Sequence, residues 1–216
     1  MRTHEYEPIP GLPEELPEGE EILWQGKPAW WSLTKRALHV RKVAAYFVIV
    51  GTWFLIDALL RGEGVPVATG ELFSQLLVGA LACGLLAIIG RWMANTTLYT
   101  ITNRRVVMRI GAALPTTVNL PYSKVEEANL RHFKDGTSDI PIRLYESEQV
   151  RFLMFWPHAR PWHLSRPEPA LRAIPDGDQA ARVLAEALEA HRAQEGQGVA
   201  EGPADSAEAG LARETS

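Results

Sequence analysis

Two long apolar stretches stand out from an otherwise mixed pattern of hydrophobic and polar positions. The first, 43–60, reads VAAYFVIVGTWFLIDALL with Asp57 as its only ionisable residue, and the second, 72–90, reads LFSQLLVGALACGLLAIIG without a charge. Both are apolar on every side, whereas a helix of a soluble core keeps a polar face. A helix needs about 17–25 apolar residues to cross a bilayer. The pattern predicts a transmembrane helical hairpin over 43–90, with two buried core helices as the alternative.

The positive charges near this hairpin lie on one side of it. Four precede the first stretch and three follow the second, namely Lys35, Arg36, Arg41, Lys42, Arg91, Arg104 and Arg105. The expected connecting loop, 61–71, has one arginine against two glutamates. Because lysine and arginine are retained on the cytoplasmic side of a membrane, we expect both termini in the cytoplasm. The turn that contains Arg104 and Arg105 is expected to face the membrane.

After the hairpin the pattern changes to a period of two, which indicates β-strands. Strands are expected at 98–102, at 105–110, once or twice within 116–130, at 139–146 and at 149–156. An amphipathic helix follows, capped by Asp176 or Asp178, with apolar residues at 180, 183, 184, 187 and 188. This order predicts an α+β membrane protein: a two-helix transmembrane hairpin, then an antiparallel β-barrel or sandwich capped by a C-terminal helix.

These elements divide the chain into four parts. Residues 1–42 form a cytoplasmic N-terminal segment, rich in proline and glutamate and then strand-like, with Trp24 expected in the core of the β domain. The hairpin covers 43–90, and the β domain with its helix covers 91–193. Residues 194–216 have almost no large apolar side chains and are expected to be disordered.

Composition and motifs argue against several classes of function. The chain has 22 basic and 26 acidic residues, a net charge of -4, which argues against a nucleic-acid partner. Its one cysteine permits neither an internal disulfide nor a cysteine-built metal site. The histidines lack helical metal-ligand spacing, and no HExxH, glycine-rich phosphate loop or nucleophile motif occurs. We therefore expect no catalytic residue, no metal and no cofactor, and a protein that is not an enzyme.

Two blocks resemble the bacterial PH-domain membrane proteins. The first is EEILWQGKP at 20–28, and the second is YTITNRRVV at 99–107 followed by LPYSKV at 120–125. The order of segments is also that of the family, over about 12–193. The resemblance implies a PH-like β domain and says little about activity, since a fold does not determine a function.

A longer block, 11–47, is similar to the start of the photosynthetic complex assembly proteins of purple phototrophic bacteria. That resemblance implies a non-catalytic protein of the bacterial inner (intracytoplasmic) membrane. It implies that reaction-centre and core-antenna (light-harvesting complex 1) subunits are partners, together with membrane lipids. It also implies three membrane spans, of which the pattern supports two, because 152–156 is too short to cross. The alternative is a general bacterial PH protein that serves as a membrane-anchored binding or stress-response module.

Twelve residues are candidates for contact with lipid or with a partner protein. They are Trp30, Trp31, Lys35, Arg36, His39, Arg41, Lys42, Asp57, Gly79, Ala80, Cys83 and Gly84. Aromatic rings and cations gather at membrane interfaces, and small residues four positions apart let helices approach closely. The small residues contact either the first span of the same chain or a helix of another protein, and a homodimer is left open.

Two of these candidates have alternative interpretations. Asp57 either pairs with Arg61 at i,i+4 or contacts a partner. His39 lies just before the first span, where a neutral imidazole could ligate the magnesium of a bacteriochlorophyll. An ordinary interfacial histidine is the favoured interpretation, and no cofactor is assigned to the chain.

Overall fold

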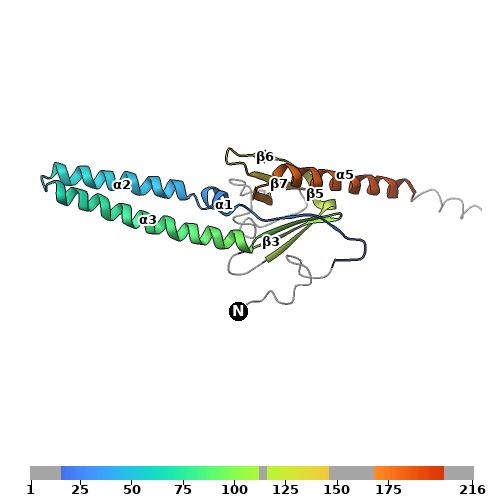
Figure 1. Ribbon diagram of the computed structural model, residues 1–216. Helices are drawn as coiled ribbons and strands as arrows, with labels where there is room; N and C mark the ends of the chain where they lie inside the picture. Colours follow the sequence, from blue (N-terminus) through green and yellow to red (C-terminus); the bar gives the residue numbers. More distant parts are fainter. Residues whose placement is uncertain (1–15, 112–115, 146–167, 202–216) are drawn as a thin grey trace, which may run out of the picture.

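The computed structural model describes residues 16–111, 116–145 and 168–201. A helical hairpin projects from a strand-rich domain, which gives an elongated molecule (Figure 1). The hairpin consists of α2 (Val40–Leu60) and α3 (Val65–Thr96). A short helix, α1 (Trp30–Ala37), lies at its base. Both helices of the expected hairpin are therefore present, and both are longer than the apolar stretches that predicted them.

The connection between α2 and α3 is shorter than the loop 61–71 expected from the sequence. The third helix of the chain already begins at Val65, so that much of the expected loop is helical. Pro66 is tolerated in the first turn of α3, where a backbone N–H has no partner within the helix. Gly62 and Gly64 supply the turn with positive φ values of 78° and 84°. The expectation of an eleven-residue loop was wrong because proline at a helix start resembles a loop signal.

The hairpin exposes its apolar side chains. Both helices are long and apolar enough to cross a membrane, and in the most apolar 18-residue stretch of each only 11% and 6% of the residues are buried. The core helices of a soluble bundle would bury most such residues. The interpretation as buried core helices therefore does not fit this structure.

The described strands form two antiparallel sheets. One has the order β1 (Ile22–Gly26), β2 (Leu98–Thr102), β3 (Arg105–Ile110) and β4 (Thr116–Pro121). In the other, β7 (Ser138–Leu144) pairs with β5 (Val125–Ala128), β6 (Arg131–His132) and β8 (Ala170–Ile174). A single 3-10 turn, Tyr122–Lys124, joins the two sheets. The α+β class is confirmed, as a sandwich of two sheets rather than a closed barrel.

The core of the domain lies between these sheets and helix α5 (Gly177–Glu201). Ile101 and Met108 from the first sheet meet Ile140 and Leu171 from the second, and Leu184 of α5 completes the cluster. The apolar stripe predicted for this helix is confirmed, since 180, 184, 187 and 188 are buried and 183 packs against them. Trp24 also packs against the core. Helix α5 continues to Glu201, into the segment expected to be a disordered tail, because alanine, glutamate and glutamine favour helix without a tertiary partner.

The sequence pattern missed several short elements, β6 among them, and one expected element lies outside the described residues. Helix α1 falls in a stretch assigned only to the N-terminal segment, and β8 follows directly on a proline-rich passage. Both are short, and short elements carry little periodicity. The strand expected at 149–156 lies outside the described residues.

Candidate functional site at the base of the hairpin

Helix α1 joins the hairpin to the sandwich and has contacts on both sides. Towards α3, Thr34 lies against Gly90 so closely that the glycine has no room for a side chain. Towards the sandwich, the Ala29 N–H donates a hydrogen bond of 2.7 Å to the carbonyl of Ala173 in β8. Leu33 is buried in a small cluster with residues of α3 and β8. The two halves of the molecule therefore meet through this eight-residue helix.

Polar groups of α1 contact the turn between β6 and β7. The Ser32 hydroxyl donates to Asp135 at 2.7 Å, and the Lys35 ammonium lies 3.1 Å from the same carboxylate. The Thr137 hydroxyl donates to the other carboxylate oxygen of Asp135 at 2.8 Å. One acidic side chain thus holds the β6–β7 turn against two side chains of α1.

Arg36 makes the third connection between α1 and the sandwich. Its guanidinium donates to the Thr137 hydroxyl at 2.8 Å and lies 3.4 Å from an oxygen of Asp139. The same group is stacked over the ring of Phe133, 3.8 Å from its centroid. A planar, delocalised guanidinium suits a site that combines an ion pair with an aromatic face.

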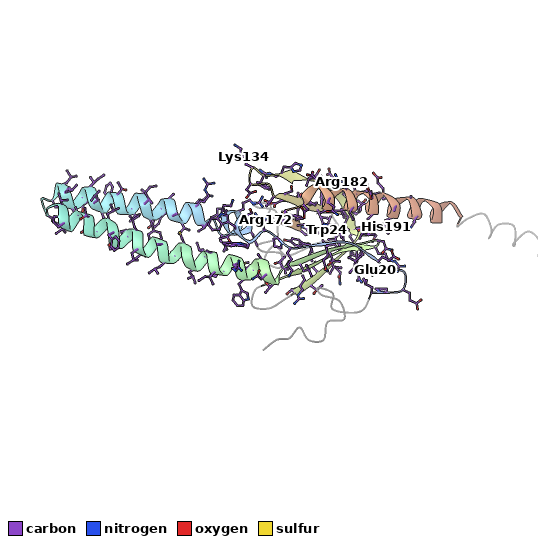
Figure 2. The ribbon with its side chains drawn as sticks, in the orientation of Figure 1. Glu20, Trp24, Lys134, Arg172, Arg182 and His191 are labelled. Atoms are coloured by element: carbon purple, nitrogen blue, oxygen red, sulfur yellow. The ribbon has the colours of Figure 1, made fainter. Side chains whose placement is uncertain are left out.

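Asp139 is shared between two arginines and a strained segment of backbone. Arg172 of β8 lies 3.5 Å from its second oxygen, and the Ala173 N–H donates to the first at 2.7 Å. Ala173 has a φ of 56°, in the left-handed region that alanine rarely adopts. Asp139 therefore helps to hold the unusual conformation from which the Ala173 carbonyl reaches α1. Figure 2 shows Arg172 beside the base of the hairpin.

The pKa values of Asp135 and Arg36 at this junction are both shifted downwards, for different reasons. Burial alone would raise the pKa of Asp135, but hydrogen bonds from Ser32, Thr137 and Lys35 outweigh it and hold that pKa well below its usual range. Burial lowers the pKa of Arg36, although the charges of Asp139 and Asp135 oppose the shift. Asp135 is therefore a carboxylate at neutral pH.

The predicted basic cluster divides into two groups in the structure. Lys35 forms an ion pair with Asp135, and Arg36 forms one with Asp139. These two cations therefore stabilise the contact between α1 and the sandwich and do not point towards lipid. Arg41 and Lys42, in the first turn of α2, are exposed. Trp30 and Trp31 are exposed as well, and the Arg91 guanidinium lies 5.7 Å from the Trp30 ring centroid.

His39 separates α1 from α2. It has a φ of 54° and precedes the first residue of α2, and its Nδ1 lies 3.2 Å from the Ala37 carbonyl oxygen. A left-handed residue at this point changes the direction of the chain between the two helices. This conformation gives His39 a structural role, independent of any pigment.

The remaining candidates lie along the hairpin and are not brought together. Asp57 forms the predicted i,i+4 ion pair with Arg61, at 3.2 Å. Gly79 fits against Phe47 of α2, and the Cys83 thiol contacts the Val40 carbonyl at 3.8 Å. These two small residues therefore face the first span of the same chain. Ala80 and Gly84 are exposed on α3, and Gly84 has no neighbour within 4 Å of the position of a Cβ atom.

The far end of the sandwich carries a second connection and a pocket. Glu20, buried before β1, accepts two hydrogen bonds from Arg105 at 2.8 and 2.9 Å and one from the Thr102 hydroxyl at 2.8 Å. Because β2 leads away from the end of α3, the turn at 103–104 lies at this far end, next to Glu20 (Figure 2). The expectation that Arg104 and Arg105 face the membrane was wrong.

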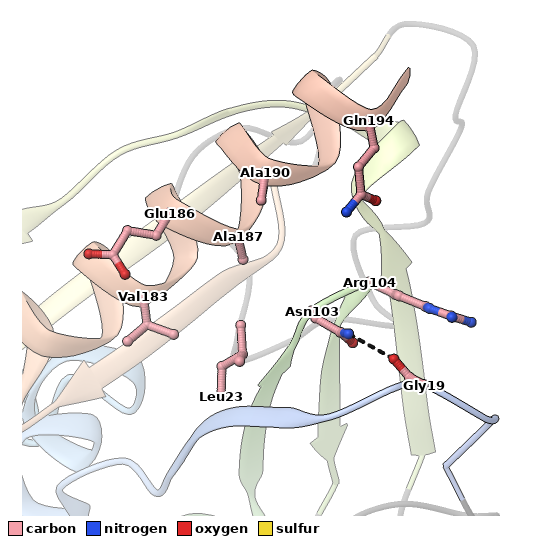
Figure 3. Close-up of a pocket in the computed structure, with 9 residues that line it drawn as sticks. All are labelled: Gly19, Leu23, Asn103, Arg104, Val183, Glu186, Ala187, Ala190 and Gln194. Atoms are coloured by element: carbon pink, nitrogen blue, oxygen red, sulfur yellow. Dashed lines mark hydrogen bonds between the residues drawn. The ribbon is translucent and has the colours of Figure 1, made fainter. Parts of the chain in front are cut away.

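A pocket of about 510 Å³ opens beside this turn, between β1 and α5 (Figure 3). Its lining is Gly19, Leu23, Asn103, Arg104, Val183, Glu186, Ala187, Ala190 and Gln194. The Asn103 amide is already engaged, because it donates to the Gly19 carbonyl at 2.8 Å. Among the described residues, no group of three His, Cys, Asp or Glu side chains is placed to hold a metal ion.

Sequence reasoning missed the acidic half of the junction. Neither Asp135 nor Asp139 is among the candidate residues, and Asp139 is buried in the structure. The available signal was the scarcity of acidic residues on the domain side of the hairpin. This scarcity does not identify which carboxylates, distant in the sequence, form ion pairs with Lys35 and Arg36.

The structure combines a two-sheet sandwich, a closing C-terminal helix and, attached through α1, a long apolar hairpin. Comparison with known proteins identifies the family of this chain. The sequence matches the family described as "Bacterial PH domain" over residues 40–188. A protein of Rhodobacter capsulatus described as "Uncharacterized 23.7 kDa protein in puhA 5'region" is 38% identical over 196 residues, which span 88% of this chain and 90% of the relative. No solved structure matches the chain. The chain belongs to the bacterial PH domain family, and the relative is consistent with the resemblance found at 11–47.

Proposed function

We propose that this protein is a membrane assembly factor that helps to build the photosynthetic reaction centre and its core light-harvesting antenna by binding their subunits, without catalysis. The observation that carries the proposal is the 38% identity, over nearly the whole chain, with a protein of the puhA 5' region. The description of that relative points to a photosynthesis-operon context for its gene. The resemblance of 11–47 to photosynthetic assembly proteins supports the same function.

The hairpin supplies the membrane anchor in this proposal. Its exposed apolar side chains are suited to the acyl chains of the bilayer of the inner (intracytoplasmic) membrane. The excess of cations on the domain side over the connection at 61–64, where Arg61 and Glu63 cancel in charge, favours cytoplasmic termini. The sandwich would then lie at the cytoplasmic surface, where newly inserted subunits present their loops.

In this proposal a helical partner would bind one face of α3. Gly79 and Cys83 are used within the hairpin, whereas Ala80 and Gly84 remain exposed at a spacing of four residues. Small residues at this spacing allow close approach of a second helix. Because α1 ties the hairpin to the sandwich, a partner bound there is held at a defined position relative to the cytoplasmic domain.

The test is deletion of the gene in a phototrophic host, read by near-infrared absorption of isolated membranes. The proposal expects loss of the reaction-centre and core-antenna bands with pigment synthesis intact, and recovery with the wild-type gene. Gly84→Leu should fail to restore the bands, while Ala45→Leu, at an exposed position of α2, should restore them. Western blotting of both variants checks that they accumulate equally.

A second candidate function is a general membrane-anchored binding or stress-response module. The family match over 40–188 favours it, because that match covers the hairpin and most of the sandwich but only the end of the block at 11–47. Unchanged absorption bands in the deletion strain would contradict the assembly function and leave this general module.

A further inference from the structure

We infer that the base of the hairpin binds the headgroups of anionic phospholipids through a basic collar, defined as Arg41, Lys42, Arg91 and Lys134. The inference rests on the proposed membrane anchoring of the hairpin and goes beyond it, because it names the lipid class that the anchor selects. The four cations come from α2, α3 and the β6–β7 turn.

The collar differs from the other cations of α1 and the hairpin, because those have acidic partners among the described residues. Lys35 and Arg36 use Asp135 and Asp139, and Arg61 at the far tip lies 3.2 Å from both Asp57 and Glu63. In the part of the chain that the structure describes, no carboxylate forms an ion pair with a collar residue. All four side chains are exposed.

The surrounding sequence explains why the collar keeps its charge. No aspartate or glutamate occurs between 22 and 56 or between 72 and 125. The two acids that reach the base from the β6–β7 region are already engaged: Asp135 with Ser32 and Lys35, and Asp139 with Arg36 and Arg172. Since no described carboxylate neutralises these exposed charges, they can bind a ligand outside the chain.

The collar covers the part of the hairpin that would leave the hydrocarbon. The start of α2 contacts Cys83, and Arg91 lies eight residues further along α3, towards the sandwich. Arg41 and Lys42 directly precede the apolar stretch of α2, while exposed Leu85, Ile88 and Trp92 continue the apolar surface of α3 past Cys83. Trp30 and Trp31 of α1 are 38% and 46% exposed beside Arg91. Lys134 extends from the turn that Asp135 anchors to α1, next to the hairpin base (Figure 2).

This combination of groups matches a phospholipid with a net negative headgroup. Ammonium and guanidinium groups bind phosphate oxygens. Indole rings occupy the interfacial layer of the membrane, and apolar side chains of α3 can pack against the acyl chains. A zwitterionic headgroup carries its own cation and gains less from the collar. Each cation near an anionic surface strengthens binding roughly fivefold, the equivalent of about 1 kcal/mol.

The experiment uses native mass spectrometry of the full-length protein in detergent with equal amounts of phosphatidylglycerol and phosphatidylcholine. The wild-type chain should retain phosphatidylglycerol in preference to phosphatidylcholine. Arg41→Gln/Lys42→Gln/Arg91→Gln should lose that preference. Arg104→Gln/Arg182→Gln/Arg192→Gln, which removes the same charge from the far end of the sandwich and from α5, should keep it.

Two results would overturn the inference. One is a wild-type chain without preference between the two lipids, and the other is an equal loss of preference in the collar and control variants. Carbonate extraction of membranes separates this failure from failure of the anchor. A chain that resists extraction but shows no lipid preference contradicts the collar alone, whereas an extracted chain contradicts the membrane anchor as well.

Discussion

Gly90 of α3 faces Thr34 of α1 with no space for a Cβ atom between the two helices. Gly84, six residues earlier in the same helix, has no neighbour within 4 Å of the position of a Cβ atom. The two glycines therefore provide a matched test of the contact between α1 and the hairpin.

We expect Gly90→Ala to destabilise the protein by about 1–3 kcal/mol, because the added methyl group forces α1 and α3 apart. Gly84→Ala should instead be neutral or stabilising by about 0.5–1 kcal/mol, since alanine loses less backbone entropy in a helix. Thermal unfolding of the full chain in detergent, followed by tryptophan fluorescence, measures both. Equal midpoints for the two variants would contradict the close contact.

Glu20 and Arg105 form a connection that ties the N-terminal segment to the first sheet. The Glu20 side chain is only 2% exposed and accepts hydrogen bonds from both Arg105 and Thr102. Glu20→Gln should cost about 1–3 kcal/mol, because it removes hydrogen bonds to a charged, buried group. Amide exchange of Ile22–Gly26 should accelerate, as β1 loses this anchor.

Glu21→Gln is the control for this change, since the neighbouring side chain is exposed. Its exchange rates in β1 should match those of the wild type. Equal protection of β1 in the Glu20 and Glu21 variants would show that the buried ion pair does not hold the strand.

The depressed pKa of Asp135 predicts a dependence of stability on acid pH. Because its folded-state pKa lies below the ordinary value of 3.8, the carboxylate contributes stability that is present above that pH. That contribution is lost as the pH falls towards the folded-state pKa. Asp135→Asn should therefore melt earlier than the wild type at pH 7, and the difference should shrink below about pH 4. A difference that stays constant from pH 7 to pH 3 would contradict this assignment.

The left-handed conformation of His39 predicts an unusual order of substitutions. Glycine adopts a φ of 54° without strain, whereas the β-branched side chain of valine is sterically strained at this φ. His39→Gly should unfold at a temperature equal to or above that of the wild type, and His39→Val should lose about 1–2 kcal/mol. Thermal unfolding distinguishes this order from that of a helix interior, where glycine would be the worse substitution.

The same pair of variants separates the structural role of His39 from pigment ligation. A chain that used the imidazole as a magnesium ligand would copurify with bacteriochlorophyll, and His39→Gly would lose it. The structural role expects equal pigment content in the wild type and the glycine variant, measured by absorption of the purified proteins.

Local pattern was sufficient for elements with strong periodicity. The hairpin, the alternation of β2, β3 and β7 and the apolar stripe of α5 were all predicted, because each follows from the spacing of apolar side chains. The first and last residues of helices and strands, and the short elements, were predicted less well from this pattern. Pro66 resembled a loop residue and begins a helix, and the five residues of β8 are too few to show a period.

The candidate site was predicted only in part. Trp30, Trp31 and the cations around the first span were identified by their position at the expected interface. Their partners were not, because Lys35 and Asp135 are 100 residues apart and no spacing rule connects them. The division of the basic residues into paired and exposed groups therefore depended on the fold.

The sequence by itself determined that this chain has two apolar helices, a strand-rich domain with a closing helix, and an excess of cations on one side of the hairpin. These properties follow from local composition and periodicity. Only the tertiary structure decided that α1 joins the two halves and that Asp139 supports the strained Ala173. It also decided that Arg41 and Lys42, unlike Lys35 and Arg36, form no ion pair with a carboxylate of the described residues. The physical reason is that ion pairs and close glycine contacts are formed between residues brought together by packing, and local sequence does not encode those neighbours.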